Sequence, residues 1–216
     1  NLAKMKYSYL VSGLNNEAKK WSFDGALSDI KQAIAIQDLP IYTQLEGDIH
    51  YLKQDYNSAL ASYKKVNESN IRSASTIFTE AKTLEMLETP AEEVLVLMDS
   101  CVAQFNKPYS ADAAPYLIER ARVRMEAKQA RNAVLDYDEC YAALLGNVND
   151  GFYNLRGQAC LESKQYQRAL DDFTKAIELN PRELTYYSEL AYVNMRVGRN
   201  QEAIDVLKKS LKIDAE

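Results

Sequence analysis

A recurring spacing of small and aromatic residues constrains the fold of this chain more than any other feature. In the stretch YQRALDDFTKAIELNP, four residues follow one another at steps of three, four and three, namely Tyr166, Ala169, Phe173 and Ala176. These steps place all four side chains on one face of a helix. Pro181 at the end of the stretch cannot continue the helix. The stretch therefore predicts an amphipathic helix that ends just before the proline.

The same pattern recurs along the chain at steps of about 34 residues, which is typical of stacked helix pairs. An alanine takes the corresponding place in five segments, at Ala26, Ala59, Ala133, Ala169 and Ala203. A preceding helical segment carries a small residue, at Gly47, Ala81, Ala121, Gly157 and Ala191. Small residues allow two helix backbones to approach closely. We predict that the small residue of each first helix faces the alanine of the second helix. The large residue of the second helix, at Tyr63, Tyr137 or Phe173, then packs toward the next pair.

This pattern resembles the tetratricopeptide repeat family. The agreement is best in residues 150–183, which carry Tyr153, Gly157, Tyr166, Ala169, Phe173, Ala176 and Pro181 at the family's offsets. The resemblance covers nearly all of the chain and implies an all-α fold, a right-handed superhelical solenoid of about six helix-turn-helix repeats in one domain spanning 1–216. The expected repeats are residues 7–39, 40–73, 74–113, 114–149, 150–183 and 184–216.

Two of these repeats depart from the pattern. In the first, Gly13 and Leu14 stand where a large residue followed by a small one is expected. The third is degenerate and has Glu93 near the alanine position. Its second helix is expected to begin with Thr89 as the cap, Pro90 in the first turn and Glu92 completing a capping box. Its extra length lies in a long loop, NKPYSADAAP, in which we expect Lys107, Pro108 and Tyr109 to be exposed and mobile.

Composition excludes several classes of partner. The net charge is −5, and the chain shows no basic composition suited to neutralising phosphates, so nucleic acid is not expected as a partner. The three cysteines are odd in number and far apart, unlike a disulfide framework.

No apolar run approaches the roughly 18 residues of a membrane-spanning helix. The chain begins at Asn1, so its compartment stays open: a soluble protein, cytoplasmic or, if a leader was removed, extracytoplasmic.

The residues needed for catalysis or metal binding do not gather in the sequence. His50 is the only histidine, and its offset favours a packed structural role. Cys140 and Cys160 occupy helix-packing offsets, and Cys101 is interpreted in the same way. The sequence has no His and Cys residues clustered at the spacing of metal ligands. It also has no glycine-rich loop of the kind that binds phosphate. Asp171 and Asp172 are interpreted as a solvated pair on an exposed helix face. We therefore expect that the protein is not an enzyme and binds no cofactor.

The family resemblance implies that the first helices line a concave groove that binds peptides or protein segments. The residues expected to contact a partner there are Tyr51, Phe78, Lys82, Ile118, Arg122, Met125, Gln158, Leu161 and Tyr192. Val11, Asn15 and Ala18 take the corresponding offsets in the first repeat. Asn15 fits one offset of a carboxylate clamp found in the family, but Val11 and Leu45 do not. The alternative is that all of these are ordinary solvated groove residues.

Lys82 and Arg122 occupy the same offset in consecutive repeats, so we expect their side chains to project side by side. With Phe78, Ile118 and Met125 they would suit a peptide with a carboxylate beside an apolar anchor. The competing interpretation is local pairing, of Lys82 with Glu85 or Glu119 and of Arg122 with Glu119 or Glu126.

The C-terminal repeat presents an apolar face of its own. Ile204, Leu207 and Leu211 match Leu170, Phe173 and Ile177, which should pack on a following repeat. We therefore expect either a longer native chain or another molecule on this end face. The leading function is a protein–protein interaction scaffold, and the alternative is a structural assembly subunit or spacer that self-associates through its end faces.

Overall fold

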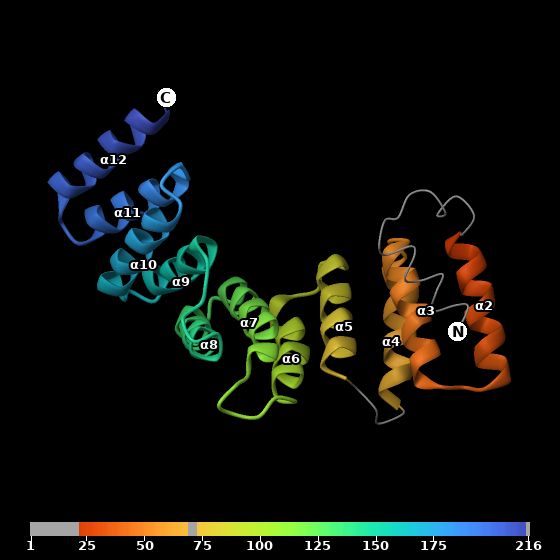
Figure 1. Ribbon diagram of the computed structural model, residues 1–216. Coiled ribbons are helices and arrows are strands. Elements are labelled where there is room, and N and C mark those ends of the chain that lie inside the picture. Colours follow the sequence, from red (N-terminus) through yellow and green to blue (C-terminus); the bar gives the residue numbers. More distant parts are fainter. Residues whose placement is uncertain (1–21, 69–72, 215–216) are drawn as a thin grey trace. The chain divides into compact units, whose positions relative to one another are not determined.

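The computed structural model describes residues 22–68 and 73–214, which form eleven α-helices, one short 3-10 helix and no strand (Figure 1). In chain order the elements are α2 (Phe23–Ile36), α3 (Pro40–Leu52), α4 (Tyr56–Glu68), α5 (Ala74–Met86), α6 (Ala91–Val102), η2 (Ala111–Ala113), α7 (Ala114–Glu126), α8 (Ala130–Ala143), α9 (Asp150–Glu162), α10 (Tyr166–Leu179), α11 (Leu184–Arg196) and α12 (Asn200–Asp214). The all-α prediction is therefore confirmed. The expectations for Val11, Gly13, Leu14, Asn15 and Ala18 lie outside the described residues.

The chain forms two compact units, an N-terminal unit of residues 1–104 and a C-terminal unit of residues 105–216. Helices α3, α5, α7, α9 and α11 begin at the residues where the second to sixth repeats were expected to begin. A single continuous solenoid through both units stays a prediction.

The N-terminal unit is built from helices that pack in chain order, each against its neighbour. Ser22 caps α2, because its Oγ accepts a hydrogen bond of 3.0 Å from the backbone N–H of Gly25. Pro40 begins α3, where a missing N–H costs nothing. Between these two helices lies a core formed by Ala26, Leu27, Ile30, Leu45 and Ile49.

The paired helices of one repeat interlock through a glycine and an aromatic ring. A Cβ atom at Gly47 would lie 2.7 Å from Tyr63 Cε1, and one at Gly157 would lie 2.9 Å from Phe173 Cε1. Both rings are fully buried. The sequence interpretation placed an alanine opposite each small residue and sent the large residue toward the next pair. In the structure the large residue itself covers the glycine, because the missing side chain leaves room for the ring.

The turns between paired helices repeat one geometry. The second residue after each first helix has a positive φ, at Gln54, Glu88, Lys128, Lys164 and Gly198. The next residue donates its backbone N–H to a carbonyl five residues earlier, for example Gln129 to Arg124 at 2.7 Å and Gln165 to Cys160 at 2.8 Å. This 6→1 bond closes the helix end and satisfies a carbonyl that the helix leaves unpaired. Four of the five turns accept the steric strain of a non-glycine residue in the left-handed region.

The third repeat differs from its sequence interpretation at the start of its second helix. Helix α6 begins at Ala91 with Pro90 at the cap position, so the predicted capping box of Thr89 and Glu92 is wrong. Proline has no side-chain acceptor, and its fixed φ sets the helix entry instead. Glu93 is exposed, and the buried residue at the inward position is Val94. The degenerate repeat therefore has its buried apolar residue one position after Glu93.

The long loop of the third repeat packs back on α8. Lys107 and Pro108 are exposed as expected, but Tyr109 is half-buried. The Lys107 ammonium pairs with the Glu139 carboxylate and lies 5.2 Å from the centre of the Tyr109 ring. These contacts tie the loop to α8, the second helix of the fourth repeat. The mobility of the loop stays a prediction.

Candidate functional site

The first helices of the N-terminal unit present three of the expected partner-binding residues, and all three are half-buried. Tyr51 lies on α3, with its ring 5.5 Å from that of Tyr56 in an edge-on contact. Phe78 and Lys82 lie one turn apart on α5. The Lys82 ammonium lies 2.5 Å from the Glu85 carboxylate. Local pairing, the competing interpretation for Lys82, is therefore present.

In the C-terminal unit, helix α7 carries Ile118, Arg122 and Met125, which are all half-buried. The Arg122 guanidinium donates to Glu119 Oε1 from Nε at 2.8 Å and from Nη2 at 2.6 Å. It also pairs with Glu126 one turn further along the helix. The charge of Arg122 is thus compensated within its own helix. Lys82 belongs to the other unit, so the side-by-side arrangement of these two cations stays a prediction.

The remaining expected groove residues lie on α9 and α11. The Gln158 amide donates to Glu189 Oε1 at 3.4 Å and so links the two helices. Leu161 is half-buried, and Tyr192 is 45% exposed. On the same face of α9, Asn154 has a buried Oδ1 that finds no hydrogen-bond partner among the described residues. An unsatisfied acceptor of this kind costs about 1–3 kcal/mol.

A hollow of about 420 Å³ lies beside the groove residue Ile118. Its other lining residues belong to the end of α8, the following loop and the start of α9, namely Leu144, Asn147, Val148, Asn149 and Phe152. The walls are therefore mainly apolar, with two amide side chains at the rim. Asn149 caps α9 by accepting a hydrogen bond of 3.0 Å from the backbone N–H of Phe152, which holds this rim in place.

The end-face residues are exposed on α12. The exposed fractions are 46% for Ile204, 40% for Leu207 and 68% for Leu211. Their counterparts on α10 are covered, since Leu170 is 6% exposed and Phe173 is fully buried. The face of α12 thus exposes apolar residues at offsets where Leu170 and Phe173 of α10 are covered.

Two buried Arg–Asp pairs escaped the sequence interpretation. Arg120 donates to Asp136 from Nε at 3.1 Å and from Nη2 at 2.5 Å, and Arg156 donates to Asp172 in the same way at 3.0 Å and 2.7 Å. The expectation that Asp172 lies on a solvated face is wrong, because its side chain is only 6% exposed. The signal was present in the sequence, because each pair joins an arginine to an aspartate sixteen residues later, and the two pairs stand at corresponding places in consecutive repeats.

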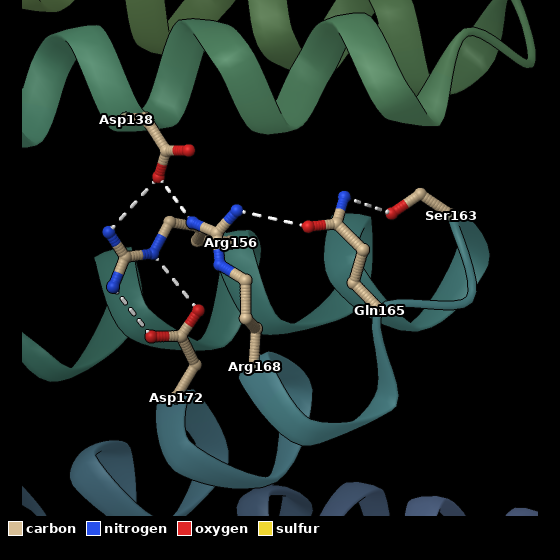
Figure 2. Close-up of polar contacts among 6 residues, drawn as sticks. All are labelled: Asp138, Arg156, Ser163, Gln165, Arg168 and Asp172. Carbon is tan, nitrogen blue, oxygen red and sulfur yellow. Dashed lines mark hydrogen bonds and ion pairs between the residues drawn. The ribbon is translucent and has the colours of Figure 1, made fainter.

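Asp138 connects consecutive repeats in the C-terminal unit (Figure 2). Its Oδ1 accepts from Arg168 on α10 at 2.5 Å and from Arg156 on α9 at 3.4 Å. Arg168 also donates to Gln165 Oε1 at 3.0 Å, and Gln165 donates to Ser163 Oγ at 3.0 Å. Helix α8 is thereby tied to the turn that joins α9 and α10.

The described residues offer little for nucleophilic or metal chemistry. Burial raises the pKa of the Cys140 and Cys160 thiols to about 11, so both are protonated and unreactive at neutral pH. Cys101 is also buried, and its Sγ donates to the backbone carbonyl of Ala74 at 3.2 Å. His50 Nδ1 lies 3.2 Å from Asp55 Oδ2. Within residues 22–68 and 73–214, no three His, Cys, Asp or Glu side chains gather in a way that could hold a metal ion.

A search of the same described ranges for a membrane span finds no helix with the length and hydropathy to cross a bilayer.

Comparison with known proteins identifies the last two repeats. Residues 152–183 and residues 184–216 each match the tetratricopeptide repeat family. Small glutamine-rich tetratricopeptide repeat-containing protein 2 of Mycosarcoma maydis is 38% identical over 58 residues, which are 27% of this chain and 16% of that protein. TPR repeat-containing protein MJ1428 of Methanocaldococcus jannaschii is 26% identical over 221 residues, 96% of this chain and 36% of that protein. The chain thus spans little more than a third of the longer match and far less of the other.

Solved structures share the fold at low sequence identity. YrrB, described as a TPR protein with an unusual peptide-binding site, has a TM-score of 0.74 at 14% identity, covering 87% of this chain and 93% of YrrB. MamA has a TM-score of 0.70 at 18% identity, covering 82% of this chain and 92% of MamA. At these identities the likeness shows the fold alone.

Proposed function

Because the chain is a tetratricopeptide repeat protein, we propose that it is a protein–protein interaction scaffold whose first helices hold a peptide or a segment of a partner protein. Proteins built from these repeats act as interaction modules, and YrrB is described as having a peptide-binding site. The groove residues of α7, α9 and α11 are the proposed contact surface in the C-terminal unit.

One observation carries this proposal, the hollow beside Ile118. Its volume of about 420 Å³ lies within the range of about 300–1,000 Å³ that is usual for recognition pockets. Apolar walls with a few amides at the rim suit an aliphatic or aromatic side chain whose backbone is oriented by hydrogen bonds. The half-buried residues Met125 and Leu161 extend the apolar surface along α7 and α9.

The cations of the groove have a smaller part in this proposal than their offsets suggested. Lys82 already pairs with Glu85, and Arg122 already pairs with Glu119 and Glu126. A carboxylate of the partner must therefore compete with these local acids. The apolar anchor supplies most of the affinity, and the cations select among partners.

Peptides selected from a random display library on the wild-type protein provide the test. Ile118→Glu places a charge in the hollow, and we expect it to weaken capture of the selected peptides at least about tenfold, since burial of an aliphatic side chain contributes about 1.5–3 kcal/mol. Leu135→Glu is the matched control, because Leu135 is an exposed aliphatic residue on the second helix α8. Equal binding by both variants would place the peptide site elsewhere.

The exposed end face favours a second function, self-association or assembly through α12. Ile204, Leu207 and Leu211 together present an apolar strip of a kind that marks contact surfaces. Sedimentation of the wild type and of Leu207→Lys with Leu211→Lys measures this directly. The proposal expects a concentration-dependent oligomer that the double variant loses, and a wild type that sediments as a monomer at all concentrations would contradict it.

A further inference from the structure

We propose that the turn edge of the C-terminal unit carries a second docking site, which takes an acidic segment of a protein. The site is a hollow of about 420 Å³ between the α7–α8 turn with the start of α8 and the α9–α10 turn, at the edge where consecutive repeats meet. Its lining comes from both turns, namely Lys128, Gln129, Ala130, Arg131, Asn132, Glu162, Ser163 and Lys164. The groove residues have no part in this lining, so the inference does not depend on the proposed groove function.

Charge is the property that distinguishes this hollow. Lys128, Arg131 and Lys164 are all exposed, and Glu162 is the one carboxylate of the lining. The side chains of these three cations make no ion pair or hydrogen bond within the part of the chain that the structure describes. By contrast, Arg122, Arg124, Arg156 and Arg168 on helices α7, α9 and α10 are all paired with acids. An excess of uncompensated positive charge therefore gathers here in a protein whose net charge is −5.

The hollow has a rigid frame. Lys128 and Lys164 occupy the same left-handed position of two identical turns, each closed by a backbone 6→1 hydrogen bond. The lining residue Ser163 accepts a hydrogen bond from Gln165, Gln165 accepts one from Arg168, and Arg168 donates to Asp138 on α8 (Figure 2). These contacts hold the α9–α10 turn against helix α8, which begins directly after the α7–α8 turn. The two lysines are thus held in register before a ligand arrives, which lowers the entropic cost of binding.

The chemistry of the lining favours a protein segment over a nucleic acid. Three cations neutralise too few phosphates to hold a polyanion at physiological salt. The lining holds no aromatic side chain on which a base could stack. The overall charge of −5 also repels a long polyanion. A short run of carboxylates fits all three constraints, with the amides of Gln129 and Asn132 and the Ser163 hydroxyl available to the peptide backbone.

A fluorescein-labelled hexaglutamate peptide is the probe, with binding followed by fluorescence anisotropy at low salt and at physiological salt. The test variant combines Lys128→Glu, Arg131→Glu and Lys164→Glu. The matched control combines Lys208→Glu, Lys209→Glu and Lys212→Glu, three exposed lysines of α12. Both triple variants have the same net charge, so long-range repulsion affects them equally. A milder pair, Lys128→Gln with Lys164→Gln, covers the case in which the charge reversals disturb folding, which circular dichroism monitors.

The inference expects wild-type binding that weakens with salt, a loss of about tenfold or more in the test variant, a smaller loss in the glutamine pair and near wild-type binding in the control. Equal loss in both triple variants would overturn it, because the binding would then follow net charge alone. It would also be overturned by a wild type that does not bind the peptide, by tighter binding of an oligothymidylate of equal charge, or by displacement of the peptide by inorganic phosphate at equal concentration.

Discussion

Replacing Gly157 by alanine tests how tightly the two helices of one repeat interlock. The new Cβ would lie 2.9 Å from Phe173 Cε1 and 3.1 Å from two more atoms of the same ring. The ring is fully buried, and a close-packed interior gives it little room to move away. Overpacking of this kind costs about 1–3 kcal/mol, whereas the change from glycine to alanine inside a helix gains about 1 kcal/mol. We expect the free energy of unfolding to fall by about 1 kcal/mol, since the clash outweighs the gain in helix propensity.

The same helix supplies the control. A Cβ at Gly151 of α9 would meet only the Asn149 Oδ1, at an ordinary contact distance of 3.6 Å. Gly151→Ala should therefore raise the free energy of unfolding by about 0.5 kcal/mol, opposite in sign to Gly157→Ala. Urea unfolding followed by circular dichroism measures both changes. In the Gly157→Ala background, Phe173→Leu should cost less than it does in the wild type, because it removes the clash. A Gly157→Ala protein as stable as the wild type would refute the interlock.

Three further changes test other parts of the structure. Asp150 accepts hydrogen bonds from Asn180 and Tyr186, which hold its pKa below the usual 3.8; its stabilisation is present above that pH and is lost as pH falls through the folded-state pKa, so the difference in melting temperature between wild type and Asp150→Ala should shrink below about pH 4. Glu88→Gly relieves a positive φ of 56° in the α5–α6 turn and should raise the urea midpoint by an amount equal to about 0.5–1 kcal/mol. Asp172→Asn leaves the largely buried Arg156 without its bidentate carboxylate and should cost about 2–3 kcal/mol in urea unfolding, whereas Asp171→Asn on the exposed side of the same helix should cost little.

The sequence pattern predicted the helices well because packing at close range leaves a periodic trace. Gly47, Gly157, Tyr63 and Phe173 stand at the same offsets in different repeats, and in the structure each glycine meets the ring of its own repeat. The pattern did not settle which residue meets which, since the same offsets allow alanine or the aromatic ring to face the glycine.

The polar interactions were harder to predict, because they depend on which side of a helix faces its neighbour. Asp171 and Asp172 are adjacent in sequence, yet only Asp172 is turned inward to Arg156. Charge alone favoured a solvated pair, and only the repeated sixteen-residue interval to an arginine could have shown otherwise. Pairing of Arg122 with Glu119 and Glu126 was correctly weighed as an alternative, because i,i+3 and i,i+4 neighbours are fixed by the helix itself.

The candidate groove residues were chosen by offset, and offset does not reveal cavities. The hollow beside Ile118 is completed by Leu144, Val148 and Phe152, which lie at the end of one repeat and the start of the next. Their contribution follows from the path of the α8–α9 loop, which has no counterpart in the helical period. The cationic hollow at the turns was missed for a similar reason, since Lys128 and Lys164 stand outside the helices that the pattern describes.

Methyl NMR of the protein bound to a selected peptide tests the scaffold proposal most directly. With isoleucine, leucine and methionine methyl groups labelled, the account predicts that the resonances of Ile118, Met125 and Leu161 on the first helices shift on binding. The methyl groups of Leu135 and Leu179, which are exposed on the second helices α8 and α10, should stay in place. Shifts confined to Leu135 and Leu179, with Ile118, Met125 and Leu161 unchanged, would contradict peptide binding by the first helices.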